Sequence, residues 1–395
     1  MTNIAKAHGL DGTLVYPDWI PLAMDEIRSL LKNLPQCGEF INILSISPRP
    51  FSAAGMVATS RGRFFIKRHH CSVRNREGLL EEHGFMAHLR NGGVPVPRVQ
   101  VSAEGQTAIE LGDWTYEIHE QSPGIDLYQD AISWTPFRSA DHAYSAGRAL
   151  AGLHSAAQGF PAAERKIRPL VASFSIFAST RPEEATRDYL QARPALADDA
   201  ATQEDCGRAL KLLAPFHAEL LPLLPGLHPL WTHNDLHASN LFWSAKGDRA
   251  QVTSIIDVGL ADRTNAVHDL AHAIERNIVE WLMLVQDKAR DGDIPVHLDH
   301  LTALLKGYES VRTLSAAEAA ALAPMTALCH AEFALTEADY FLGALHSATR
   351  ARVATRDYLV GHARWFHTRT GEMLLSAIRN WAAARVQQQP AGAQR

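Results

Sequence analysis

The sequence predicts an α+β protein of two lobes, a small antiparallel β-sheet lobe with one inserted helix and a larger, mainly helical lobe. Three observations support this prediction. The chain of 395 residues is long for one compact unit. Short runs rich in β-branched and aromatic residues occupy its first third. Beyond Pro123-Gly124, long Ala- and Leu-rich stretches with helical spacing dominate.

The N-terminal part begins with an extension, residues 1–35, in which an amphipathic helix is expected over 17–34 and stops at Pro35. The sheet lobe, 36–121, follows. One helix is expected to interrupt its strands, over 74–90, because Asn91-Gly92-Gly93 is a good C-terminal signal. Runs of strand-forming residues bounded by Pro, Gly, Ser and Asp predict five strands, over 40–47, 55–60, 64–68, 107–111 and 114–120.

The second lobe covers residues 122–386. Helical patterns are clear over 139–157 and over most of 269–386. The exception is a short β-hairpin, with strands over 241–243 and 252–256 joined by turn-forming residues. The final residues, 387–395, are expected to form a disordered tail.

The composition excludes several classes of protein. With 46% hydrophobic and 21% charged residues, it is that of an ordinary soluble globular protein. The net charge of -5 offers no general basic surface, so we expect no nucleic-acid partner. The N-terminus has no unbroken apolar segment, so we also expect no membrane contact. Four widely spaced cysteines without a CxxC pair fit a reducing cytoplasm.

Residues 230–243, LWTHNDLHASNLFW, form an unusually polar segment between large apolar side chains. Asn240 stands at the entry to the first hairpin strand and Asp257 at the exit of the second, and these two ends of an antiparallel hairpin are neighbours. Such a pair of oxygen ligands suits Mg2+. Asp235 precedes Asn240 on the same loop and could accept a proton beside the metal. This division of labour is the one that phosphoryl transfer requires.

A phosphoryl-transfer site also needs a cation for the nucleotide phosphates and a carboxylate that holds this cation. Lys67 ends the predicted strand Phe64-Phe65-Ile66-Lys67. On the following helix, Glu82 falls on the apolar face, where a carboxylate requires a partner. We therefore expect Glu82 to pair with Lys67.

These motifs resemble the aminoglycoside phosphotransferase and choline kinase-like family, a small-substrate branch of the protein-kinase fold, over roughly residues 40–276. Where the family usually carries HGDLHPGN, this chain has HNDLHASN at 233–240, and for IDFG it has IDVG at 256–259. The segments VPVPRV, 94–99, and ALAGLHS, 149–155, also look like family segments.

The resemblance implies a bilobal protein-kinase-like fold and a role for each candidate. Asp235 would be the catalytic base, and Asn240 and Asp257 would be the Mg2+ ligands. Lys67 would contact the nucleotide phosphates and pair with Glu82.

The resemblance also implies supporting residues. His233 would orient the catalytic loop, and Asp269, in HDLAH, would support that loop from a helix. The linker around His119 to Gln121 would offer backbone groups to the nucleotide base.

The chain departs from the family pattern at three places. Asn234 replaces a glycine and Ala238-Ser239 replace a Pro-Gly pair, so the loop backbone is expected to differ or to carry another substrate contact. No GxGxxG precedes Lys67, but Ser52 and nearby backbone N–H groups in the loop 48–55 could cover phosphates.

Together these features predict an ATP-dependent kinase with Mg2+ as cofactor and GTP as an alternative donor. The acceptor would be the hydroxyl group of a small molecule, such as an amino alcohol, a sugar or an aminoglycoside. Acidic residues on the later helices, Glu332, Glu337 and Asp339, would favour a cationic acceptor.

Three alternatives stay open at this point. The pieces EEHGFMAHL and VPVP resemble a bacterial stress-response Ser/Thr kinase of the same fold, which would act on a protein substrate. A catalytically silent nucleotide-binding scaffold is a second alternative. The third is a metal-dependent hydrolase, whose ligands would be His233, Asp235, His237, His268, Asp269 and His272.

Overall fold

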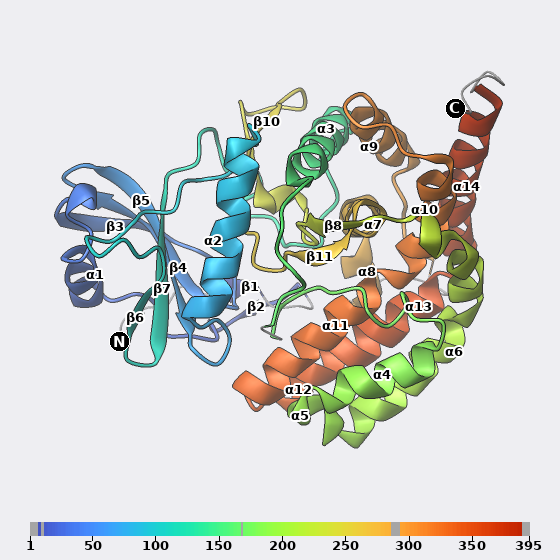
Figure 1. The fold of residues 1–395 in the computed structure, drawn as a ribbon, viewed down its shortest axis with the longest axis horizontal. Helices are drawn as coiled ribbons and strands as arrows, with labels where there is room; N and C mark the ends of the chain where they lie inside the picture. The colour runs from blue at the N-terminus through green and yellow to red at the C-terminus, as the bar shows by residue number, and fades with distance from the viewer. Residues whose placement is uncertain (1–6, 9–11, 167–168, 286–292, 389–395) are drawn as a thin grey trace.

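The computed structural model describes residues 7–8, 12–166, 169–285 and 293–388. In Figure 1 the sheet lobe lies on the left and the helical lobe on the right, with helix α2 (Arg76–Asn91) between the sheet and the helices. The predicted α+β class and the two-lobed architecture are confirmed.

The N-lobe is built on one antiparallel sheet in the order β3-β4-β5-β7-β6. The connection from β5 to β6 contains helix α2, as predicted, and Asn75 caps this helix by accepting a hydrogen bond from the Gly78 N–H. The strands of the sheet are β3 (Phe40–Ile46), β4 (Ala53–Thr59), β5 (Gly62–His70), β6 (Ile109–Leu111) and β7 (Trp114–Glu120).

The N-terminal extension contains less helix than predicted. Two short strands, β1 (Ala7–His8) and β2 (Leu14–Val15), pair with each other, and helix α1 covers only Met24–Leu31. The expected helix over 17–34 begins late because the residue before a proline is pushed out of the helical region, and Ile20 precedes Pro21. The buried side chains of α1 pack on the sheet and form a core separate from that of the helical lobe.

The C-lobe is mainly helical, and its predicted helix over 139–157 is observed as α3. Its helices are α3 (Ala140–Ala157), α4 (Pro182–Gln191), α5 (Pro194–Ala197), α6 (Ala200–Leu220), α7 (Ala266–Ile278), α8 (Trp281–Val285), α9 (Leu298–Glu309), α10 (Ala316–Leu328), α11 (His330–Asp339), α12 (Ala348–Arg352), α13 (Gly361–Trp365) and α14 (Arg369–Gln388). Two π-helical segments, Tyr340–Ala344 and Val353–Val360, continue α11 and α12.

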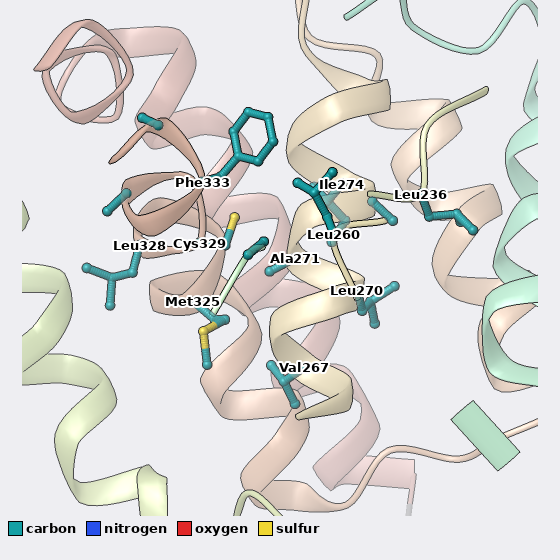
Figure 2. Packing of buried hydrophobic residues seen from close by; sticks show 14 of the residues in the cluster. Leu236, Leu260, Val267, Leu270, Ala271, Ile274, Met325, Leu328, Cys329 and Phe333 are labelled. Atoms are coloured by element: carbon teal, nitrogen blue, oxygen red, sulfur yellow. The ribbon is translucent and has the colours of Figure 1, made fainter. Parts of the chain in front are cut away.

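Helix α7 is the central element of the C-lobe, because every residue from Ala266 to Ile278 is buried. Figure 2 shows its apolar side chains, such as Ile274, between Leu236 of the polar loop and α10–α11 residues such as Phe333. Polar residues on such a helix cannot reach solvent, so the protein has to supply their partners.

Two antiparallel strand pairs frame the polar loop. The predicted one pairs β9 (Leu241–Trp243) with β10 (Val252–Ile255). The other pairs β8 (Pro229–Thr232) with β11 (Asp262–Asn265) and was not predicted, because β11 is polar and shows no apolar alternation. Together the two strand pairs bring the loop 233–240 next to the segment 256–261.

The C-terminal helix extends into the region that the sequence predicted to be a disordered tail, 387–395, since α14 ends at Gln388. The remainder of this tail lies outside the described residues. Among the helices of the described chain, none combines the length and apolar character required to cross a bilayer.

Candidate active site

The backbone of the loop 233–240 is held by a carboxylate from the buried helix α7. Asp269 accepts hydrogen bonds from the backbone N–H groups of His233 and Asn234, at 2.8 Å each, and lies 3.0 Å from Nε2 of His154. Burial alone would raise the pKa of Asp269, but these partners hold it below its ordinary value. Asp269 is therefore an ionised anchor for the loop.

His233 joins this loop to the segment that follows β10. Its Nε2 donates to the carbonyl oxygen of Ile256 at 2.9 Å, and its Nδ1 accepts from the backbone N–H of Asp235 at 3.2 Å. The imidazole is completely buried, so these contacts place Asp235 relative to the residue that precedes Asp257.

Asn234 retains the backbone conformation that a glycine would favour. Its φ is +60°, in the left-handed region that asparagine tolerates better than most other residues. The amide side chain donates to the carbonyl of Ala172 at 2.9 Å and accepts from the hydroxyl of Thr232 at 2.8 Å. This φ is one that the glycine of the family pattern would also adopt readily, and the extra side chain ties the loop to the C-lobe.

A buried asparagine holds the part of the loop where the family pattern has Pro-Gly. Asn277 accepts from the Ala238 N–H at 2.9 Å and donates to the carbonyl of Leu236 at 2.8 Å. Ser239 Oγ lies 2.8 Å from Nδ1 of His237. The Ala-Ser pair is therefore accommodated by contacts within the C-lobe.

Asp235 faces a small cavity and is joined to a buried arginine. Its Oδ1 lies 2.7 Å from Nη1 of Arg276, and its Oδ2 accepts from Nδ2 of Asn240 at 3.1 Å. Burial raises the pKa of Asp235, although the Arg276 guanidinium opposes this shift. A carboxylate of raised basicity within a cavity is suited to accept a proton.

Asn240 and Asp257 meet at the open end of the β9–β10 hairpin, as the strand pairing predicted. The Ile256 N–H donates to the carbonyl of Asn240 at 2.9 Å. The Asn240 Nδ2 is engaged by Asp235, which leaves its carbonyl oxygen as the ligand atom of the amide. An amide oxygen and a carboxylate are hard oxygen donors, and this donor set fits Mg2+.

Lys67 of β5 forms an ion pair with Asp257, whose φ of +58° places it in the left-handed region. Nζ of Lys67 lies 2.9 Å from Oδ1 of Asp257. Burial would lower the pKa of Lys67, but the carboxylates of Asp257 and Glu117 raise it. The lysine is therefore charged beside the proposed metal ligand.

The predicted ion pair between Lys67 and Glu82 is wrong. Glu82 Oε1 instead accepts from Nε of Arg74 at 2.6 Å and from Nη2 of Arg165 at 2.8 Å. Both arginines also donate to the carbonyl of Gly259, at 2.8 and 2.9 Å. We call these three side chains, Arg74, Glu82 and Arg165, the Glu82 clamp. Glu82 is on the inward face of α2 as predicted, but the clamp joins α2 to the segment after Asp257.

The linker residues His119 and Gln121 line the same cavity as Lys67. His119 Nε2 lies 2.7 Å from Oε2 of Glu117, and His69 and His83 each place Nε2 3.0 Å from the same carboxylate. Burial would raise the pKa of Glu117, but the histidines, His119 first, hold it well below its ordinary value. The side chain of His119 thus supports a buried anion behind Lys67.

The loop 48–55 lies between the lobes. Arg49 donates to the hydroxyl of Ser133 at 3.0 Å and to the carbonyl of Ala131 at 3.2 Å. The ring of Phe51 packs edge-on against Tyr340, with ring centroids 5.1 Å apart. These contacts with the C-lobe place Ser52 on the walls of two cavities.

Two cavities meet at the predicted site. The larger, of about 350 Å3, is bounded by the sheet, the linker and the β9–β10 hairpin. The smaller, of about 110 Å3, extends into the C-lobe and is lined by Asp235. Both are lined by Arg49, Ser52, Lys67, Asn240 and Asp257. The side chains predicted to bind phosphate and metal therefore converge, with the predicted base on the side of the smaller cavity.

Sequence reasoning missed the arginines that organise the site, which are Arg49, Arg74, Arg165 and Arg276. For Arg276 a signal was present, because it lies two helical turns after Asp269 and therefore on the same face of α7. For Arg165, in a segment without periodicity, the sequence contained no such signal.

The ligand set of the alternative hydrolase is not assembled. His233 and Asp269 are committed to the backbone contacts above. Within the part of the chain that the structure describes, the groups of three potential metal ligands close to one another lie elsewhere, at His83, Glu117 and His119 and at His297, Asp299 and His300.

The acids expected to favour a cationic acceptor have different surroundings. Glu332 is engaged by Ser173 and Ser175, at 2.5 and 2.9 Å from their hydroxyl groups. Asp339 lies 3.8 Å from Arg193. Of these three predicted acids, Glu337 is the one that lines the smaller cavity.

The fold and the site define a phosphotransferase with an alcohol group as acceptor. The chain belongs to the phosphotransferase enzyme family, whose model matches residues 56–312. The family resemblance indicated by the motifs is therefore confirmed.

Relatives of known name are small-molecule kinases. The chain is 30% identical to the homoserine kinase of Methylobacterium radiotolerans over 264 residues, which cover 67% of this chain and 70% of that enzyme. It is 26% identical to the homoserine kinase of Mesorhizobium japonicum over 323 residues, which cover 82% and 87% of the two chains.

Solved structures share the fold. A microcompartment-associated aminopropanol kinase superposes with a TM-score of 0.57 at 18% identity, covering 90% of this chain and 99% of that one. An aminoglycoside phosphotransferase from Alicyclobacillus acidocaldarius superposes with a TM-score of 0.54 at 15% identity, covering 93% and 98%.

Proposed function

We propose that this protein transfers the γ-phosphoryl group of ATP to the hydroxyl group of a small molecule that binds in the smaller cavity. The observation that carries this proposal is the meeting of the two cavities at Lys67, Asn240 and Asp257, with Asp235 on the acceptor side. The larger cavity, with a volume of about 350 Å3 against about 110 Å3 for the smaller one, is assigned to the nucleotide.

The proposed roles follow from the contacts of each side chain. Asn240 and Asp257 would hold Mg2+, which neutralises charge on the phosphates when it is bound. Lys67 adds a positive charge at the junction of the cavities. Asp235 accepts the proton of the acceptor hydroxyl, because it lines the smaller cavity and burial raises its pKa.

The nucleotide is proposed to lie against the linker. The walls of the larger cavity combine apolar side chains from the sheet, such as Ala54 and Phe65, with His119 and Gln121. Ser52, which lines both cavities, would cover the phosphates. GTP is the competing donor, and a direct comparison of the two nucleotides in the assay below separates them.

A small acceptor is favoured over a protein substrate. Asp235 is only 8% exposed, and the cavity that reaches it has a volume of about 110 Å3. To bring a hydroxyl group to Asp235, a folded protein substrate would have to insert part of its backbone into this recess along with the side chain. Because the named relatives are homoserine kinases, we propose homoserine as the first acceptor to test.

The test measures ADP formation with Mg-ATP and L-homoserine for the unmodified protein and for Asp235→Asn. Loss of the general base is expected to lower kcat by about 10²- to 10⁴-fold. ATP affinity should change little, because Asp235 does not line the larger cavity. Turnover of Asp235→Asn close to that of the unmodified protein would eliminate Asp235 as the base.

A further inference from the structure

The smaller cavity is lined by charged side chains with incompletely partnered polar atoms, among them Arg276 and Glu337. In the described part of the chain, Nε and Nη2 of Arg276 and Oε2 of Glu337 are buried and have no hydrogen-bond partner. Arg276 is 2% exposed and Glu337 is 1% exposed. A buried polar atom without a partner costs about 1 to 3 kcal/mol, so such atoms usually have a function.

One nitrogen of the Arg276 guanidinium is engaged by a carboxylate, and aromatic rings pack against the group. Nη1 lies 2.7 Å from Oδ1 of Asp235. The guanidinium carbon lies 3.9 Å from the ring centroid of Phe333 and 4.8 Å from that of Trp134. These aromatic contacts stabilise the cation without using its N–H groups. The unpartnered atoms, Nε and Nη2, form the edge of an arginine that binds a carboxylate through two parallel hydrogen bonds.

Glu337 lies one helical turn beyond Phe333 on α11, so both side chains face the same direction, toward the cavity that they line. Burial raises the pKa of Glu337 to about 8, opposed by Arg276 and reinforced by Asp235 and Glu275. An ammonium group beside Glu337 would supply the positive charge that favours its ionised form.

We propose that Arg276 and Glu337 form a subsite for the zwitterionic end of a hydroxylated α-amino acid, with Arg276 binding the carboxylate and Glu337 the ammonium group. This inference rests on the proposed function and specifies its acceptor. The hydroxyl group of the same molecule would extend to Asp235, which is already joined to Arg276.

The charge and the volume of the cavity fit this class of ligand. A zwitterion adds no net charge to a buried site that already contains Arg49, Lys67, Asp235 and Asp257. Ion pairs with Arg276 and Glu337 would offset part of the cost of removing its two charged groups from water. The volume of about 110 Å3 suits a small amino acid better than an aminoglycoside.

The test uses three acceptors that share one hydroxyl-bearing chain: L-homoserine, 3-aminopropan-1-ol, which lacks the carboxylate, and 4-hydroxybutyrate, which lacks the ammonium group. The unmodified protein should prefer homoserine over either analogue by about 10- to 100-fold in kcat/KM, since each lost contact is a hydrogen bond to a charged group. Equal kcat/KM for homoserine and 3-aminopropan-1-ol would overturn the assignment of Arg276.

Two variants separate recognition from positioning. Arg276→Lys keeps a cation beside Asp235 but removes the two-pronged edge, so kcat/KM for homoserine and 4-hydroxybutyrate should fall about tenfold or more relative to kcat/KM for 3-aminopropan-1-ol. Glu337→Gln should reduce kcat/KM for homoserine and 3-aminopropan-1-ol relative to kcat/KM for 4-hydroxybutyrate. Asp339→Asn, on the same helix but outside the cavity, is the control and should not alter acceptor preference. An equal loss for all three acceptors in Arg276→Lys would mean that Arg276 acts on Asp235 alone.

Calorimetric titration of homoserine without nucleotide distinguishes failure of this inference from failure of the proposed function. Binding that is weakened by Arg276→Lys and by Glu337→Gln, without phosphate transfer, would support the subsite and refute the kinase reaction. Phosphorylation of 3-aminopropan-1-ol without binding of homoserine would refute the subsite and leave the kinase reaction intact. Absence of homoserine binding to the unmodified protein overturns the subsite in either case.

Discussion

Replacing Glu82 by alanine removes the carboxylate that joins two buried guanidinium groups, those of Arg74 and Arg165. The three side chains of this clamp are between 0% and 4% exposed. Glu82 Oε1 accepts from both arginines, at 2.6 and 2.8 Å. Without Glu82, two positive charges remain buried next to each other.

The expected loss in the free energy of unfolding is about 3 to 5 kcal/mol, the usual cost when one partner of a buried ion pair is removed. Two charge-assisted hydrogen bonds of about 1.5 to 3 kcal/mol each lead to a similar figure. The carbonyl of Gly259, to which both arginines also donate, keeps the loss from being larger. Because a domain of this kind is stable by about 5 to 15 kcal/mol, Glu82→Ala should still fold.

The assay is equilibrium unfolding in urea, with Glu81→Ala as the matched control. Glu81 is the adjacent residue on α2, its side chain is 28% exposed, and it contacts Arg165 at 3.2 Å, so its removal should cost less than about 1 kcal/mol. A loss below about 1 kcal/mol in Glu82→Ala would refute the clamp. A nucleotide affinity of folded Glu82→Ala as low as that of Lys67→Met would indicate that Glu82 acts through Lys67 after all.

Three further predictions concern the loop, the metal ligand and the core. Asp257→Asn should keep the fold, because asparagine tolerates the φ of +58°, but should weaken Mg2+-dependent ATP binding about tenfold or more; unchanged titrations with and without Mg2+ would contradict the ligand assignment. Asn234→Ala should be less stable in thermal unfolding than Asn234→Gly by about 1 kcal/mol, since only glycine relieves the φ of +60°; equal stabilities would argue against this strain. Burial raises the pKa of Glu275 from 4.5 to about 7, so stability should fall as the pH rises through this range by about 1.4 kcal/mol per unit, and the slope should flatten in Glu275→Gln.

The local sequence predicted the elements well where chemistry and periodicity agree. The α2 helix and the β9–β10 hairpin lie within a few residues of their predicted limits, because caps, turns and strand-forming runs are short-range signals. The helix of the N-terminal extension was predicted too long, since Pro21 had been placed inside it. The β8–β11 pair escaped prediction because its second strand is polar and is stabilised by distant partners.

In the candidate site, too, the sequence predicted some contacts and only the structure assigned others. The spacing of Asp235, Asn240 and Asp257 follows from one loop and one hairpin, so the sequence alone determined that these side chains would meet, and the family motif in which they lie determined the class of enzyme. The partner of Lys67 is decided across 190 positions of sequence, and only the packed structure assigns it to Asp257 and turns Glu82 toward two arginines.

What the tertiary structure alone decided is which buried charges face one another. The sequence shows that a buried carboxylate needs a positively charged partner, but several cations could supply it. Which one does depends on how the helices and strands pack. Arg276 on the buried helix α7 contacts Asp235, and Glu337 on α11 lines the same cavity. Short-range motifs therefore predicted the reaction class. The acceptor pocket forms only when helices that are distant in the sequence pack together.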